Sequence, residues 1–223
     1  MINQGKGKTS TIFGLLTGIV LAGALLTGAA QAAVSVHVIQ NDPTPGDASI
    51  VPSSTLPSAD FISPDINFNT TNSDGTPLHT FLNNPTFFNQ LNGFNPNAFS
   101  DNIFLEISGQ TFLNAGLNSF VVGHDDGVVL TFADPTIGTV VNQPGPTGFV
   151  GTPFNVNNTK AAGLFTFDLK YTECCDGPAN LVFAINGAPV GPPVGAVPEP
   201  STLILLGTGL AGLVIWRRHL KDF

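Results

Sequence analysis

Asp125 and Asp126 are the only two acidic residues that adjoin each other in the chain, and they stand in a predicted turn that ends at Gly127. In extended backbone, neighbouring side chains point to opposite faces of a sheet, so both carboxylates can serve one site only where the chain bends. Two gathered like charges repel each other, and a hard cation such as Ca²⁺, which prefers carboxylate and carbonyl oxygens, relieves that repulsion. The alternative is a solvated Asp-Asp-Gly hairpin turn, for which Asp-Gly is a strong signal by itself.

Short segments with the patterns of β-strands surround this turn. Residues 119–123 and 128–132 flank it, and we expect them to form a hairpin. Residues 164–171 place Phe165, Phe167, Leu169 and Tyr171 on one face, as alternation in a strand requires. Further strands are expected at residues 34–38, 103–107, 109–113 and 181–185. Many short strands, with no amphipathic helix of useful length in the middle, indicate an all-β antiparallel β-sandwich.

The segments between these strands are rich in Pro, Asn, Asp and Gly. Residues 41–64 are expected to be mainly loop, and residues 134–153 loop or short edge strands. Residues 83–101 are expected to form a long connection, packed by Phe87, Phe88, Phe94 and Phe99.

The low content of charged residues and the negative net charge limit the classes of molecule that the chain could bind. Only 10% of residues are charged, and residues 33–198 hold two lysines against 13 acidic residues, a net charge of −11. Nucleic-acid binding is disfavoured because it needs a basic footprint. An acidic surface instead suits cations and solubility outside the cell.

The N-terminal residues have the form of a secretory signal peptide. Lys6 and Lys8 precede an apolar run at residues 12–26, and Ala30-Gln31-Ala32 gives a small-x-small cleavage pattern. We therefore expect residues 1–32 to be removed by signal peptidase, which leaves a β-sandwich domain at residues 33–195. A retained signal anchor is the alternative.

The C-terminal residues combine three elements in a fixed order. Pro198-Glu199-Pro200 is followed by an apolar stretch to Trp216 and then by a basic tail that begins at Arg217. The stretch is long enough for a short transmembrane helix with a cytoplasmic positive tail. Residues 196–223 resemble the PEP-CTERM sorting signal. This resemblance implies transient anchoring in the inner membrane, processing by an exosortase, and release to the cell surface or extracellular matrix. A permanent single-span anchor is the alternative.

The order of motifs in the middle of the chain is informative as well. Residues 104–112, residues 117–130 around the paired acids, and residues 162–173 with Tyr171-x-Glu173 resemble a PA14-type β-sandwich over roughly residues 100–186. The resemblance implies that Asp125 and Asp126, joined by a cis peptide bond, hold a Ca²⁺ that contacts sugar hydroxyls. Asn155, Asn157 and Asn158 are candidates for a further ligand. The chain departs from the family at residues 132–135, which replace an Asp-Gly turn, and in having a single Trp and a single Tyr.

Cys174 and Cys175 are adjacent and are the only cysteines. An intrachain bridge would have to be a vicinal disulfide; otherwise each thiol is free or pairs between molecules. We expect the vicinal disulfide, because the signal peptide sends the chain to an oxidising compartment.

Together these features predict an exported, non-enzymatic domain that binds extracellular polysaccharide with the help of Ca²⁺. The alternative is a structural matrix protein with no specific ligand. An enzyme is the third possibility, because His37, His79 and His124 offer bases, but no Ser or Cys nucleophile motif accompanies them.

Overall fold

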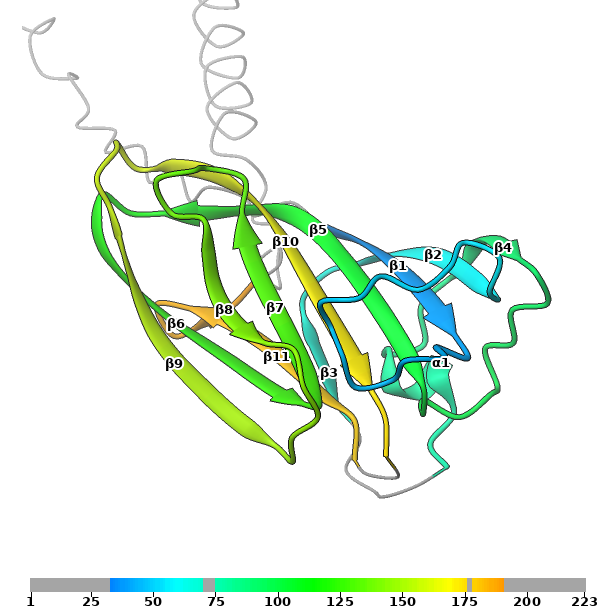
Figure 1. Ribbon diagram of the computed structural model, residues 1–223. Helices are drawn as coiled ribbons and strands as arrows, with labels where there is room; N and C mark the ends of the chain where they lie inside the picture. The colour runs from blue at the N-terminus through cyan, green and yellow to red at the C-terminus, as the bar shows by residue number, and fades with distance from the viewer. Residues whose placement is uncertain (1–32, 70–74, 176–177, 191–223) are drawn as a thin grey trace, which may run out of the picture. The chain divides into compact units, whose positions relative to one another are not determined.

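Two antiparallel sheets contain nearly all the regular structure of the domain (Figure 1). The computed structural model describes residues 33–69, 75–175 and 178–190. The predicted signal peptide and the predicted C-terminal sorting signal lie outside the described residues. No helix within the described ranges is long and apolar enough to cross a membrane.

The first sheet contains seven strands of the described chain. They are β1 (Val34–Gln40), β2 (Ser58–Ser63), β4 (Phe88–Leu91), β5 (Ile103–Leu113), β7 (Gly127–Phe132), β8 (Thr139–Gln143) and β10 (Gly163–Glu173). Their order across the sheet is β4-β2-β1-β5-β10-β7-β8. The long strands β5 and β10 pair over their full lengths, from Gly163 opposite Leu113 to Glu173 opposite Ile103, and form the centre of this sheet.

The second sheet contains β6 (Gly116–Asp125), β9 (Val150–Asn158), β11 (Asn180–Ile185) and β12 (Ala188–Pro189), in the order β12-β11-β6-β9. The short strand β3 (Asn67–Asn69) also pairs with β11. The one described helix, α1 (Leu78–Phe81), is a single turn. All recorded strand pairs are antiparallel, so the predicted all-β antiparallel sandwich is confirmed.

Phenylalanine rings join the two sheets. Phe120 of β6 and Phe183 of β11 face Phe132 of β7 and Phe167 of β10, with ring centroids 5.8 Å apart for Phe120–Phe132 and 5.5 Å for Phe167–Phe183. All four side chains are at most 2% exposed. Burial of aromatic surface of this size dominates core energetics, and edge-to-face contacts add to it.

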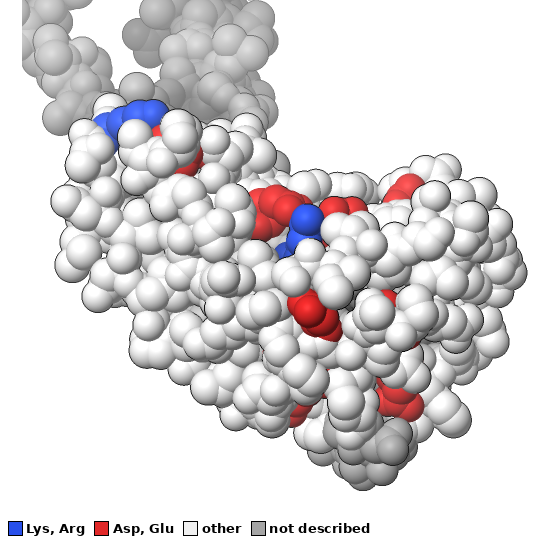
Figure 2. Space-filling model, in the orientation of Figure 1, with Lys and Arg blue, Asp and Glu red and all other residues white. Residues whose placement is uncertain are grey.

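The surface carries little charge. Figure 2 shows that one face has few charged side chains and that acidic ones outnumber basic ones on it.

The predicted hairpin at residues 119–132 is wrong. β6 pairs with β9 and β11, whereas β7 pairs with β8 and β10, so the chain passes from one sheet to the other at Asp125-Asp126. An Asp-Gly signal reports that the backbone bends, but it does not specify which strands then pair. The peptide bond between Asp125 and Asp126 is cis.

The predicted loops are partly correct. Residues 41–64 include β2, in which Ala59 and Phe61 are fully buried and Ile62 is exposed. In the 83–101 connection, Phe87 packs against Phe94 with centroids 5.0 Å apart. Phe88 and Phe99, also expected to pack there, are 44% and 59% exposed. Composition identified the connection, but it could not tell which rings turn inward.

Candidate metal and ligand site

The site lies at one end of the sandwich, where three chain segments meet. Asp125 ends β6 opposite Asn180, the first residue of β11. Gly127 begins β7 opposite Thr172 of β10. The register therefore brings Glu173, the last residue of β10, beside the two aspartates.

Three carboxylates converge at this point. Side-chain oxygens of Asp125, Asp126 and Glu173 all lie within 4.8 Å of one another. The three residues are 7%, 5% and 0% exposed. Carboxylates that are both buried and this close are costly when charged, because each loses water and repels the others.

Asp126 is held by two backbone donors from different segments. The N–H of Thr147, in the loop between β8 and β9, donates to Oδ1 at 3.0 Å. The N–H of Cys174, just after β10, donates to Oδ2 at 2.8 Å. These bonds orient the carboxylate and connect the β6–β7 crossing to both neighbouring segments.

Glu173 has one oxygen with a partner and one without. Its Oε2 lies 2.6 Å from the hydroxyl of Tyr171, which also contacts the carbonyl oxygen of Asp125. Within the part of the chain that the structure describes, Oε1 is buried and has no hydrogen-bond partner. A buried acceptor of this kind marks a place where a proton or a cation belongs.

The protonation state follows from this environment. Burial, together with the negative charges of Asp126, Asp125 and Asp101, raises the pKa of Glu173 to about 9. Burial and the charge of Asp126 also raise the pKa of Asp125. Glu173 is therefore neutral at pH 7 unless a positive charge arrives. The Tyr171 hydroxyl has one hydrogen but contacts two oxygens, so the carboxyl proton of Glu173 supplies the hydrogen for one of these contacts.

The donor set fits a hard divalent cation. All three groups offer oxygen ligands of the type that Ca²⁺ prefers, and Oε1 of Glu173 has a free acceptor position. The resemblance implied Asp125 and Asp126 as ligands, and the structure brings both together. Glu173, the third carboxylate of this cluster, was not predicted from the sequence. The signal was available, because alternation from Tyr171 places Glu173 on the same inward face.

Asn155, Asn157 and Asn158 are not part of this site. In the β6–β9 register Asn155 lies opposite Ser119 and Asn158 opposite Gly116, whereas His124 lies opposite Val150. Six residues of strand separate Ser119 from Asp125, a distance of roughly 20 Å. The side chain of Asn158 donates to the carbonyl oxygen of Asn114 instead, at 3.0 Å. The prediction was wrong because proximity in sequence to an expected loop does not determine the register of a long strand.

An open pocket of about 350 Å³ lies over the aspartates. Its lining consists of Asp125, Asp126, Pro146, Thr147, Gly148, Cys174, Cys175 and Pro178. Cys174 and Cys175 form the predicted vicinal disulfide in its wall. Among the described residues that line the pocket, Asp125 and Asp126 are the only ionisable groups.

Gly127 permits the close packing beneath this pocket. A Cβ at this position would lie 2.0 Å from the carbonyl oxygen of Pro144 and 3.0 Å from Cγ2 of Thr172. Real side chains do not tolerate such contacts, so only glycine allows the β8–β9 loop to approach the β6–β7 crossing.

The three histidines considered as bases serve separate structural contacts. His37 Nδ1 lies 2.6 Å from Oδ1 of Asp60 on the outer face of the first sheet. His79 Nδ1 donates to the carbonyl oxygen of Pro96. His124 is fully buried, and its Nδ1 donates to the carbonyl oxygen of Asp126. They lie on β1, α1 and β6, and none of the three sits beside a cysteine thiol, because both cysteines are in the disulfide.

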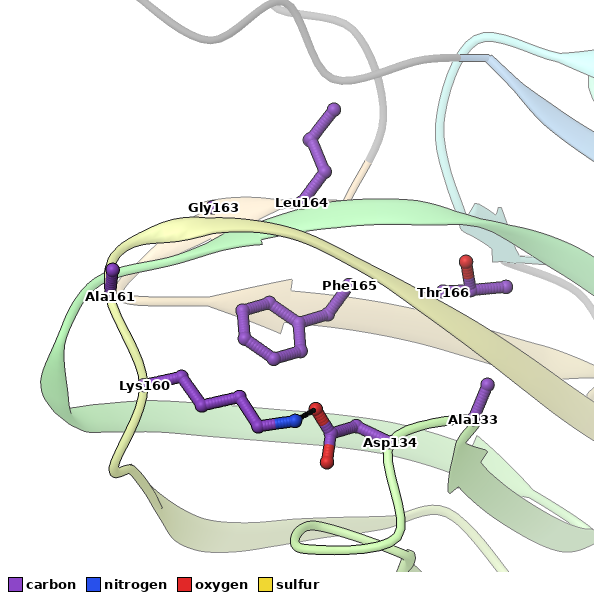
Figure 3. A pocket seen from close by; sticks show the side chains of 8 residues that line it. All are labelled: Ala133, Asp134, Lys160, Ala161, Gly163, Leu164, Phe165 and Thr166. Carbon is purple, nitrogen blue, oxygen red and sulfur yellow. Dashed lines mark hydrogen bonds and ion pairs between the residues drawn. The ribbon is translucent and has the colours of Figure 1, made fainter.

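A second hollow of about 490 Å³ is lined by the 133–134 and 160–166 segments (Figure 3). Lys160 and Asp134 point toward each other there and form an ion pair of 2.5 Å. Asp134 also accepts hydrogen bonds from the N–H and the hydroxyl of Thr136. The Asp134 carboxylate in this hollow therefore has partners in Lys160 and Thr136, whereas Oε1 of Glu173 has none among the described residues.

Comparisons with known proteins address both the C-terminal residues and the domain. The family model of the PEP-CTERM protein-sorting motif matches residues 196–218. No curated protein matches the chain. Among solved structures, the PA14 domain of MpAFP antifreeze protein is similar, with a TM-score of 0.49 and 14% identity over 74% of this chain and 84% of that one.

Two further solved structures are similar. The PA14 sugar-binding domain from an RTX adhesin has a TM-score of 0.48 and 16% identity over 72% of this chain and 94% of that one. The epithelial adhesin 6 A domain from Candida glabrata, solved with Galβ1-3GlcNAc, has a TM-score of 0.44 and 12% identity over 75% and 87% of the two chains. The chain thus carries a PEP-CTERM sorting motif, which implies exosortase-dependent export, together with an all-β sandwich that is similar to PA14 domains.

Proposed function

We propose that this protein is an exported, non-catalytic binding module that holds Ca²⁺ at Asp125, Asp126 and Glu173 and binds extracellular glycans at the pocket above them. The observation that carries the proposal is the convergence of three buried carboxylates, of which Asp125 and Asp126 line an open pocket and Glu173 has an unpartnered oxygen. A buried arrangement of this kind has little use without a proton or a cation to balance it.

Each ligand has a distinct part in this proposal. Asp126 is already oriented by two backbone N–H groups, so it is a preformed ligand with lone pairs to spare. Asp125 and Glu173 have raised pKa values, and both lose that shift when positive charge neutralises the cluster. A bound Ca²⁺ supplies charge balance for the acids and coordination positions for sugar hydroxyls.

Phe149 is the side chain that we assign to sugar stacking. It follows the pocket residue Gly148 and is 61% exposed. Its ring lies over Gly123 of β6, where a Cβ would come within 3.2 Å of Cε2. Exposed aromatic rings beside polar groups provide the apolar surface on which sugar rings stack. The Phe149 ring thus provides an aromatic stacking surface in a chain that has a single Trp and a single Tyr.

The proposed route begins with signal peptidase at residues 1–32 and a transient stay in the inner membrane. An exosortase then acts near Pro198, Glu199 and Pro200, in the matched sorting motif. Release to the cell surface or the extracellular matrix places the domain among polysaccharides and free Ca²⁺. The acidic net charge of residues 33–198 is compatible with that location.

The test of Ca²⁺ binding compares the melting temperature of the full chain in millimolar Ca²⁺ and in EDTA. Ligand at about a hundred times its Kd stabilises a folded protein by about 2.7 kcal/mol. We expect a clear upward shift that disappears in the Asp125→Ala, Asp126→Ala double variant. The control removes two acids outside the cluster, with Asp47→Ala and Asp168→Ala. Equal melting temperatures of the wild-type chain in Ca²⁺ and EDTA would contradict the proposal.

The test of glycan binding uses a glycan array probed with and without Ca²⁺. Binding should require Ca²⁺ and should weaken in Phe149→Ala, whereas the Ca²⁺-dependent melting shift of that variant stays intact. Exposed Phe88 on β4 offers a matched control, Phe88→Ala. Binding that is equal in Ca²⁺ and EDTA would contradict glycan recognition through the ion.

A structural matrix protein without a specific ligand is the second candidate. The observation that favours it is that both oxygens of Asp126 already accept backbone hydrogen bonds, so the acids also connect three chain segments. In that case the double aspartate variant would lose the same stability in Ca²⁺ and in EDTA, and the array would show no binding.

A further inference from the structure

The two sulfurs of the vicinal pair lie beside a carboxylate. Sγ of Cys174, Sγ of Cys175 and a side-chain oxygen of Asp126 are all within 4.8 Å of one another. The Cys174 side is buried, with 2% of the residue exposed, whereas Cys175 is exposed in the pocket wall. These are the only cysteines of the chain, so no other intrachain thiol competes for either sulfur.

Whether Cys174 and Cys175 form a disulfide or are two thiols decides what their sulfurs can bind. Thiolates are soft ligands that select metals such as Zn²⁺, whereas disulfide sulfurs carry no charge and are weak ligands. Every chain is synthesised with thiols, so the dithiol form precedes the bridge. We propose that, in this dithiol form, Cys174 and Cys175 together with Asp126 make a binding site for a thiophilic divalent cation such as Zn²⁺ or Cd²⁺.

The surrounding structure preorganises two of the three ligands. The N–H groups of Thr147 and Cys174 fix the Asp126 carboxylate, and neither bond involves a sulfur atom. Gly46 closes over the buried sulfur, since a Cβ there would lie 3.0 Å from Sγ of Cys174 and 2.7 Å from Cγ of Pro146. The Cys174 sulfur is thus confined next to Asp126, and the open pocket leaves room for water as a fourth ligand of a tetrahedral ion.

Reduction of the disulfide and binding of the metal require no further protein group. A phosphine reductant converts the bridge to two thiols and takes up the oxygen of one water molecule as phosphine oxide. The two thiols lose their protons to solvent as the metal–sulfur bonds form. Reoxidation by a two-electron oxidant such as molecular oxygen, which is reduced to hydrogen peroxide, closes the S–S bond and releases the metal. The bridge and the soft metal therefore exclude each other. This inference does not depend on Ca²⁺ binding, although Asp126 is common to both sites.

The experiment titrates Cd²⁺ alone into the full chain in Ca²⁺-free buffer, before and after reduction with the phosphine. The ultraviolet charge-transfer absorption of cadmium–thiolate bonds reports binding. We expect one ion per chain in the reduced protein and no such absorption in the oxidised protein. Affinity should fall on the order of tenfold or more in Asp126→Asn, a loss that even an outer-shell partner of a metal produces. Asp168→Asn is the matched control and should bind like the wild type.

Two results would overturn the site. One is a reduced chain that gives no cadmium–thiolate absorption. The other is equal Cd²⁺ affinity in the wild type and in Asp126→Asn, because binding would then need only the two sulfurs. X-ray absorption of the Cd²⁺-loaded wild-type chain tests the same ligands without a variant. Two sulfur ligands plus oxygen ligands are expected, and a shell of a single element would contradict the proposal.

Discussion

The hydroxyl of Tyr171 lies 2.6 Å from Oε2 of Glu173, and both side chains are completely buried at the end of β10. Complete burial raises the pKa of Tyr171 well above its usual value, so the hydroxyl keeps its proton. This contact holds Oε2 of Glu173, whereas Oε1 is buried and has no hydrogen-bond partner among the described residues.

Tyr171→Phe should lower the free energy of unfolding by about 1–3 kcal/mol, because it deprives a buried carboxyl of its partner. The ring itself is retained, so packing against Phe81 is largely preserved. Urea unfolding of the two proteins measures the difference. Thr131→Val removes an exposed hydroxyl that contacts Thr139 and should change stability by no more than about 0.5 kcal/mol. Equal losses in the two variants would show that Tyr171 has no special role.

Without metal, the domain should become less stable as pH rises from about 5 to about 9. The folded-state pKa of Glu173 is about 9 against an ordinary value of 4.5, so the folded chain keeps a proton that the unfolded chain has released. Stability then falls by up to about 1.4 kcal/mol per pH unit across this window. Unfolding in EDTA at pH 6 and pH 8.5 measures this slope.

Glu173→Gln should remove most of that pH dependence, since the amide cannot ionise. Glu106→Gln, a partly exposed acid in β5, should leave the slope as in the wild type. A wild-type slope that survives Glu173→Gln unchanged would contradict the assignment.

Gly127→Ala should destabilise the domain by about 1–3 kcal/mol or more, because the new methyl group would overlap the carbonyl oxygen of Pro144. Gly151 in β9 has open space at the equivalent position, so Gly151→Ala is the control and should be nearly neutral. Thermal unfolding in EDTA compares the two. A neutral Gly127→Ala would mean that the loop can move away without loss.

Sequence patterns predicted the strand content well and the strand partners poorly. Alternation identified β1 and β10, because one face of each is buried and side chains repeat every second residue. Residues 181–185 were expected as a strand and lie in β11, whereas the two strands expected at residues 103–107 and 109–113 are parts of the single strand β5. Local signals could not place β6 and β7 in different sheets, since pairing depends on β9, β10 and β11, which lie far along the chain.

The sequence likewise predicted only part of the carboxylate site. The adjacent aspartates mark a bend that is visible in the sequence. The third carboxylate comes from 47 residues further along the chain and meets them only through the β7–β10 register. The asparagines of β9 were assigned to the wrong end of their strand for the same reason.

Asn157→Ala should therefore leave Ca²⁺-dependent stabilisation unchanged, because Asn157 lies opposite Leu117 near the far end of β6. Asp125→Asn should abolish most of it. Melting curves in Ca²⁺ and EDTA measure both variants. Loss of the Ca²⁺ response in Asn157→Ala would show that the register does not separate β9 from the site.

The most direct test of the three-carboxylate site is calorimetric titration of Ca²⁺ into the full chain, with Glu173→Gln and Glu106→Gln titrated in parallel. The wild type and Glu106→Gln should each bind one ion with similar affinity, whereas Glu173→Gln should bind at least about tenfold more weakly. Absence of heat-detected Ca²⁺ binding by the wild type would contradict the account. Equal affinities in all three proteins would remove Glu173 from the site.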